Sequence, residues 1–116
     1  MSNPSKRKGS SFEGAVAAYL AASLQDDRIE RRTLGGTNDR GDIGGVRYAG
    51  KRVVVECKAC KTLETAKWLR EAETERRNDE AAFGVVVSKR RGVGDKNTGE
   101  QLVLMTLGTF INLLKE

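Results

Sequence analysis

Two charged residues, Glu56 and Lys58, directly follow a run of three valines, and their types and spacing suit metal-assisted chemistry. Side chains two apart in a strand point to the same face, so both charges share one face and Cys57 takes the other. A charge beside an apolar strand is costly to bury unless it is paired or holds a metal ion. A second carboxylate, Asp42, precedes Glu56 by 14 residues. Asp42 and Glu56 could therefore hold a hard cation, with the backbone carbonyl of Cys57 and water as further oxygen ligands.

A cation in that position would polarise a phosphoryl oxygen and lower the pKa of a bound water molecule. Lys58 would orient or deprotonate that water, or neutralise the charge that builds up on the phosphate. The structural alternative is a surface salt bridge between Lys58 and a carboxylate, which would contribute little to stability. The chain contains no histidine, so the usual general base and the usual zinc ligand are absent.

The composition predicts a single globular domain with a polyanionic partner. The chain has 116 residues, of which 38% are hydrophobic and 32% charged, and its net charge is +5. That charge favours nucleic acid over an anionic membrane surface, because no amphipathic basic helix is evident. No apolar run approaches the length of a membrane span, and no apolar segment follows the basic N-terminus. We therefore expect a cytoplasmic protein without a membrane partner.

A β-hairpin is expected to bring the two carboxylates together. Residues 43–48, interrupted by Gly44 and Gly45, and residues 51–59 predict two strands that are joined by a tight turn. Asp42 and Glu56 then lie near the strand ends away from the turn, close to each other.

The remaining patterns predict an α/β fold, in which helices flank a mixed central sheet in the order α-β-β-β-α-β-β-α. A strand over residues 83–88 follows a helix, so it should run parallel to the central strand as a βαβ crossover. The apolar residues of the last helix are expected to cover the core, namely Phe110, Ile111, Leu113 and Leu114. The other expected elements are a helix to residue 24, a strand over 28–34, a helix from 62 to 78 or 80, a strand over 101–107 and a helix over 108–116.

Glu13 lies on the apolar stripe of the first helix, where a carboxylate needs an explanation. At 100° per residue it falls between Leu20 and Leu24. Ser10 or Ser11 should cap this helix, and Ser10-x-x-Glu13 matches a capping box in which the glutamate reaches back to the backbone N–H of the cap. An active-site acid is the other interpretation, and the pattern leaves both open.

Cys57 and Cys60 form a C-x-x-C pair, which is the spacing of a redox motif or of half a zinc site. No second ligand pair exists in the chain, and a redox pair normally lies at a helix N-terminus. The better interpretation makes Cys57 a small core residue on the apolar side of its strand. Trp68, in the second helix, is interpreted as a core residue or an oligomer contact ahead of a base-stacking residue.

Basic residues outside the acidic cluster predict contacts to phosphate. The loop over residues 89–96 combines four cations with glycines, which suits phosphate contacts, and a solvated turn is the alternative. Residues 1–9 are expected to form a mobile basic arm, or equally a solvated tail. The glycine-rich loop over residues 35–41 lacks the Gly-Lys-Ser/Thr ending of a P-loop, which disfavours nucleotide hydrolysis. The predicted DNA contacts are Lys6, Arg7, Lys8, Arg32, Thr37, Arg40, Lys89, Arg90 and Arg91.

Gly41 and Asp42, followed after the valine run by the ECK of residues 56–58, resemble the motif of PD-(D/E)xK nucleases, with Gly41 in place of the motif's proline. The predicted order of elements resembles the restriction-endonuclease-like core of that superfamily. The stretch RKGSSFE over residues 7–13 resembles the start of archaeal-type Holliday junction resolvases and their phage-encoded relatives. In those enzymes a glutamate of the first helix joins the metal site.

The resemblance implies phosphodiester hydrolysis that depends on Mg²⁺, for which Mn²⁺ substitutes, in a homodimer that presents two sites to a four-way DNA junction. Asp42 and Glu56 would ligate the metal, and Lys58 would activate the water. Glu13 would complete the acidic cluster as a further metal ligand, which favours its interpretation as an active-site acid. Residues 10–116 would then form a single nuclease domain behind the basic arm.

Three other functions remain open on these patterns. A restriction- or repair-type nuclease would cut ordinary duplex DNA with the same site. A non-catalytic DNA-binding module on the same fold would have no reason to keep Asp42, Glu56 and Lys58 together. A small redox or zinc protein would depend on Cys57 and Cys60.

Overall fold

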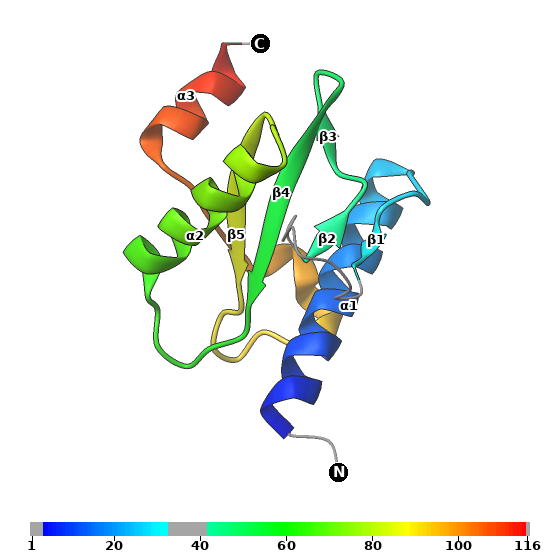
Figure 1. The fold of residues 1–116 in the computed structure, drawn as a ribbon. Coiled ribbons are helices and arrows are strands. Elements are labelled where there is room, and N and C mark those ends of the chain that lie inside the picture. Colours follow the sequence, from blue (N-terminus) through cyan, green and yellow to red (C-terminus); the bar gives the residue numbers. More distant parts are fainter. Residues whose placement is uncertain (1–3, 33–41, 116) are drawn as a thin grey trace.

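The computed structural model describes residues 4–32 and 42–115, with side chains from Ser11 onward. Helices pack on both faces of one mixed sheet (Figure 1). The strands are β1 (Glu30–Arg31), β2 (Ile43–Gly44), β3 (Arg47–Tyr48), β4 (Lys51–Lys58), β5 (Phe83–Ser88) and β6 (Leu102–Leu104). The helices are α1 (Pro4–Leu24), α2 (Thr65–Asn78), α3 (Leu107–Leu114) and a 3₁₀ helix, η1 (Asp95–Glu100). The predicted α/β class with a mixed sheet is therefore confirmed.

β4 is the central strand of the sheet, and its valine run is buried because helices cover both faces of the sheet there. Val53, Val54 and Val55 are 7%, 0% and 3% exposed. The strand order is β1-β2-β4-β5-β6, and β3 also pairs with β4. β5 runs parallel to β4 after the α2 crossover, as predicted, with Lys58 opposite Ser88. β2 and β3 run antiparallel to β4.

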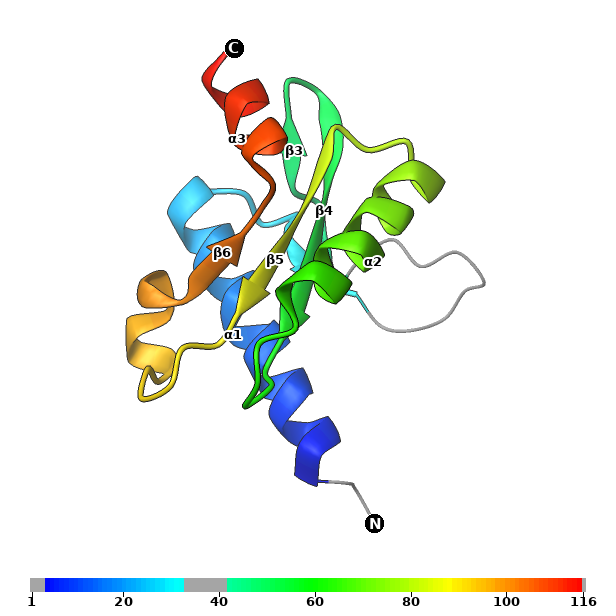
Figure 2. The same cartoon turned by 90° about the vertical axis from the view of Figure 1, so that its left-hand side faces the viewer.

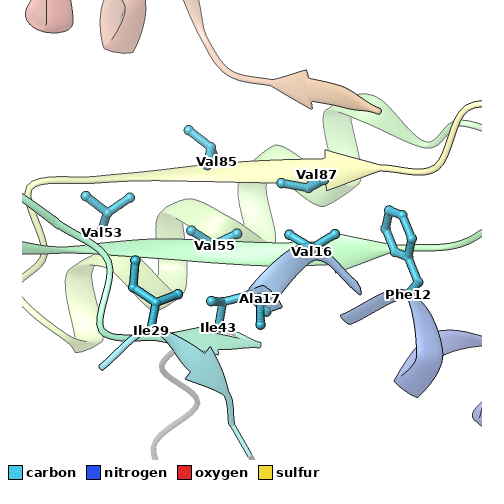
Figure 3. Packing of buried hydrophobic residues seen from close by; sticks show 9 residues of the cluster. All are labelled: Phe12, Val16, Ala17, Ile29, Ile43, Val53, Val55, Val85 and Val87. Carbon is cyan, nitrogen blue, oxygen red and sulfur yellow. The ribbon is translucent and has the colours of Figure 1, made fainter. Parts of the chain in front are cut away.

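Two apolar clusters hold α1 and α2 against opposite faces of the sheet (Figure 2). In the second of them, Trp68 and Ala72 of α2 pack with Val86. Side chains alternate along β4, so the residues next to those of the α1 cluster face α2. The α1 cluster includes Phe12, Val16, Ala17, Ile29, Ile43, Val53, Val55, Val85 and Val87 (Figure 3).

The predicted hairpin forms between residues 43 and 58, with the interruption at the two glycines. Ala49 and Gly50 both have a positive φ, 52° and 82°, which is the pattern of a type I′ turn. Gly45 has a φ of 89° and lies against the backbone carbonyl of Arg28, where a side chain would not fit. The expected strand over 28–34 is shorter, since β1 covers only Glu30–Arg31 within the described residues.

The first helix begins earlier than its pattern predicted. α1 starts at Pro4, so residues 4–9 are helical where we expected a mobile arm. Proline suits the first turn of a helix, because its φ is preset and its missing N–H would be unpaired there anyway. Ser10 and Ser11 therefore lie inside the helix, and the capping-box interpretation of Glu13 is wrong.

The last helix was expected to cover the core, and this prediction is wrong. No residue of α3 is buried, and Phe110, Ile111 and Leu114 are 47%, 41% and 67% exposed. Thr106 caps this helix by accepting a hydrogen bond from the Thr109 backbone N–H at 3.1 Å. Its apolar residues therefore point largely away from the sheet. Within the described ranges, no helix combines the length and the apolar character needed to cross a bilayer.

Candidate active site

Glu56 and Lys58 lie at the carboxyl end of β4, on the face that α2 covers. Glu56 is 6% exposed, and its Oε1 has no hydrogen-bond partner among the residues described. A buried polar atom without a partner costs free energy, roughly 1–3 kcal/mol and more for a charged group. The hydroxyl of Ser88, opposite Lys58 on β5, is also buried without a partner there. Polar groups of this kind suggest that this end of the sheet binds a ligand.

Asp42 lies directly before β2, and hydrogen bonds fasten it to the same end of β4. Its backbone N–H donates to the Val55 carbonyl at 2.9 Å. Its Oδ2 accepts a hydrogen bond of 2.7 Å from the backbone N–H of Cys57. Cys57 lies between Glu56 and Lys58 in sequence, so the hairpin brings both predicted carboxylates to one strand end.

Glu13 lies on the α1 side of this strand end. Its Oε2 accepts a hydrogen bond of 2.9 Å from Arg31 Nε, which takes the place of the predicted cap. Burial raises the pKa of the Cys57 thiol, and the negative charges of Asp42 and then Glu13 raise it further. Both carboxylates are therefore near enough to Cys57 to act on its thiol electrostatically.

The donor set matches the preferences of Mg²⁺. Carboxylate and carbonyl oxygens are hard ligands, and Mg²⁺ commonly binds through one or two carboxylates and keeps several waters. Among the residues of 4–32 and 42–115 whose side chains are described, no three acidic, cysteine or histidine groups lie close enough to hold a metal ion. Asp42 and Glu56 would thus need the Cys57 carbonyl and water to complete the shell. The partnerless Glu56 Oε1 fits such a ligand, while the metal role of Glu13 stays a prediction.

Lys58 is positioned by two residues of α2. Its Nζ lies 3.8 Å from Glu71 Oε2 and 6.0 Å from the centroid of the Trp68 ring. Trp68 is 2% exposed, which confirms its interpretation as a core residue. The contact with Glu71 is partly exposed and contributes little stability, so it orients the ammonium more than it holds the fold.

Sequence reasoning missed Glu71 and Ser88 as neighbours of Lys58. Glu71 was missed because it is one of several acidic residues on the charged outer face of α2. Ser88 ends an apolar strand, and a serine at a strand end carries no signal of its own. Only the parallel register of β4 and β5 reveals that it faces the same site.

The predicted DNA contacts are only partly placed. Lys89, Arg90 and Arg91 follow β5, and the Lys89 backbone N–H donates to the Lys58 carbonyl at 3.0 Å. Arg32 is half-buried and its side chain lies over Gly44 of β2. The remaining predicted contacts fall outside what is described: Thr37 and Arg40 altogether, and the side chains of Lys6, Arg7 and Lys8, whose backbone belongs to α1.

The two cysteines do not resemble a redox pair. Both are free; Cys57 is half-buried and Cys60 exposed. A reactive cysteine needs a lowered pKa, whereas the pKa of Cys57 is raised. This supports Cys57 as a packing residue, and it contacts the α1 cluster as predicted.

Comparison of the chain with protein-family models, with curated proteins and with solved structures found no match in any of the three.

Proposed function

We propose that this chain is a metal-dependent endodeoxyribonuclease that hydrolyses phosphodiester bonds in branched DNA, above all in four-way junctions. The hydrogen bond between Cys57 N–H and the Asp42 carboxylate carries the proposal, because it holds one acid at the strand end that bears Glu56 and Lys58. The net charge of +5 supports a polyanionic substrate. The preference for junctions rests on the resemblance of residues 7–13 to junction resolvases.

The proposed fold is the restriction-endonuclease-like core. Its support is the succession of a first helix, an antiparallel hairpin and the parallel β4-α2-β5 unit. The proposed acids and the lysine then come from the hairpin and the central strand, as they do in the motif that the sequence resembles.

The residues of the site divide the work of hydrolysis. A bound Mg²⁺, or Mn²⁺ in its place, would supply positive charge and a water molecule of lowered pKa. Asp42 and Glu56 would bind it through carboxylate oxygens, with Glu13 adding negative charge nearby. Lys58, directed by Glu71 and Trp68, would orient the attacking water or neutralise charge on the phosphate.

We also propose that the protein is a homodimer, with α3 in the interface. Leu107, Phe110, Ile111 and Leu114 are exposed on this helix. Residues 107–114 include no charged side chain, and charged residues are depleted at the centre of homodimer interfaces. The edge strand β6 directly precedes the helix and exposes Val103, which extends the apolar surface. A second copy is the expected occupant, because a four-way junction offers two equivalent strands to two sites.

Cleavage of a labelled four-way junction beside its matching linear duplex tests the proposal, with Mg²⁺, with Mn²⁺ and with a chelator. Paired symmetrical nicks in the junction alone, lost with the chelator, are the expected result. Equal cutting of both substrates would support the nuclease and refute the junction preference. Tight binding without cutting of either substrate would leave a non-catalytic DNA-binding module.

A further inference from the structure

A pocket opens at the carboxyl ends of β4 and β5, beyond the proposed catalytic residues. Its volume is about 450 Å³, and it is lined by residues 59–61, which follow β4, and residues 89–92, which follow β5. The two strands are parallel, so the loops that leave them emerge at the same edge of the sheet. Ala59 directly follows Lys58, which connects the pocket wall to the proposed site.

The lining of this pocket is strongly cationic. It includes Lys61, Lys89, Arg90 and Arg91, and none of the described residues that line it is acidic. Among the described residues, Lys61, Lys89 and Arg91 form no ion pair, whereas Lys58 has Glu71 within 4 Å. A concave surface with several uncompensated cations raises the local concentration of anions. Phosphate groups are among the anions that lysine and arginine bind through strong charge-assisted hydrogen bonds.

Hydrogen bonds hold the second wall of the pocket in place. The Gln101 side chain accepts from the Arg90 backbone N–H at 2.7 Å and donates to the Val93 carbonyl at 3.5 Å. Arg90 Nη1 donates to the Glu100 carbonyl at 3.1 Å. The Lys89 backbone N–H donates to the backbone carbonyl of Lys58 on the neighbouring strand. These hydrogen bonds fasten the loop at Lys89, Arg90 and Val93.

We propose that this pocket binds backbone phosphates of the DNA that flank the phosphate that is cleaved, and that Lys61 is one of its phosphate contacts. This inference rests on the proposed function, since it takes DNA as the polyanion. Lys61 is three residues beyond Lys58, a separation of at most roughly 10 Å along the chain. That distance corresponds to about three nucleotide steps of duplex, so flanking phosphates of the same substrate reach the pocket.

The size of the pocket favours a nucleic-acid strand over a single inorganic anion. A water molecule occupies about 30 Å³ of liquid, so the pocket has room for more than one phosphate group. The four cations also carry more positive charge than one inorganic phosphate carries negative charge at pH 7. The DNA backbone supplies several phosphates at regular spacing, which matches both the volume and the charge.

Cys60 provides a direct test, because its exposed thiol lies in the pocket wall while Cys57 is half-buried. The full chain is treated with iodoacetamide in the presence of a chelator, and alkylation of each cysteine is followed by mass spectrometry. Saturating four-way junction or duplex should slow alkylation of Cys60 by about tenfold, since access controls the reaction. Binding of the same DNA is measured in parallel by fluorescence anisotropy, and Cys60→Ser verifies the assignment of the label.

A matched pair of variants isolates the phosphate contact. Lys61→Ala should weaken DNA binding several-fold and lower the slope of log affinity against log salt by about 1. Lys51→Ala, at the opposite end of β4, should leave both unchanged. Circular dichroism confirms that each exposed substitution leaves the fold intact.

The outcomes separate this inference from the nuclease proposal. DNA binding without protection of Cys60, or an unchanged salt slope in Lys61→Ala, would overturn the pocket and leave the nuclease proposal standing. Protection by inorganic phosphate at millimolar concentration without protection by DNA would show an anion pocket outside the DNA path. Absence of DNA binding altogether would refute both proposals.

Discussion

The Asp42 carboxylate accepts a 2.7 Å hydrogen bond from the backbone N–H of Cys57, the residue between Glu56 and Lys58. One Asp42 oxygen is thereby directed to the central strand, and the side chain cannot turn away without losing a charge-assisted bond. The proposed metal ligands are thus held by the backbone of the hairpin itself.

Glu56→Gln should abolish cleavage and stabilise the protein in the absence of metal. The change removes a proposed metal ligand and also a buried carboxyl group, one oxygen of which has no hydrogen-bond partner among the described residues. We expect a loss of turnover of at least about 100-fold and a rise in the free energy of unfolding of roughly 1–3 kcal/mol. Junction binding should be retained. Cleavage assays and urea unfolding measure the two effects, with the exposed Glu80→Gln as the control that should change neither.

Mg²⁺ should stabilise the wild-type protein against unfolding. A ligand that binds only the folded state at 100 times its Kd adds about 2.7 kcal/mol to the free energy of unfolding. Thermal unfolding with Mg²⁺ and with a chelator measures this, and the Asp42→Asn/Glu56→Gln double variant should show no difference between the two. If Mg²⁺ stabilised the double variant against unfolding as much as it stabilised the wild type, the metal would bind elsewhere.

The raised pKa of Cys57 predicts a loss of stability at alkaline pH. Burial raises this pKa from an ordinary value of 9.0, so above pH 9 the unfolded chain loses the thiol proton while the folded chain keeps it. The contribution of the Cys57 thiol to the free energy of unfolding is fully present below pH 9. Above that pH it falls by up to about 1.4 kcal/mol per pH unit. Unfolding from pH 8 to 11 measures the slope, and Cys57→Ala should reduce it. An equal slope in both proteins would show that other groups cause it.

Substitution on the exposed face of α3 should break the proposed dimer. Phe110→Asp places a charge in the apolar surface, and we expect the dimer dissociation constant to rise by at least about 100-fold. Light scattering after size-exclusion chromatography measures the mass. Leu63→Asp introduces the same charge at an exposed apolar residue outside α3 and should leave the dimer intact. A monomeric wild-type protein would contradict the dimer itself.

The sequence predicted the hairpin and the βαβ unit well, because both depend on local patterns. Valine runs define β4 and β5, and β5 covers Phe83–Ser88 as expected. The placement of Asp42 beside Glu56 follows from the same hairpin. Glycines at the turn and at the break mark where the chain must change direction.

The errors concern contacts that no local pattern encodes. Glu13 pairs with Arg31, 18 residues away, and the capping box that suggested a partner within one helical turn was misleading. The apolar stripe of α3 looked like a core-facing stripe, since periodicity reveals an apolar face and not what covers it. The pairing of Lys58 with Glu71 depends on how α2 packs across β4, which the sequence pattern leaves undetermined.

The hydrogen bonds at the carboxyl ends of β4 and β5 also differ in the length of the chain segment between the two residues that they join. Asp42 and Cys57 are 15 residues apart, whereas the link from Lys89 to Lys58 encloses about twice as much chain, including all of α2. Loop-closure entropy grows with that separation, and contacts of low sequence separation form faster. We expect the acidic half of the site to assemble early in folding, and the cationic pocket only after the crossover has docked. A chain emerging from the ribosome would then form its proposed metal site before its proposed phosphate-binding pocket.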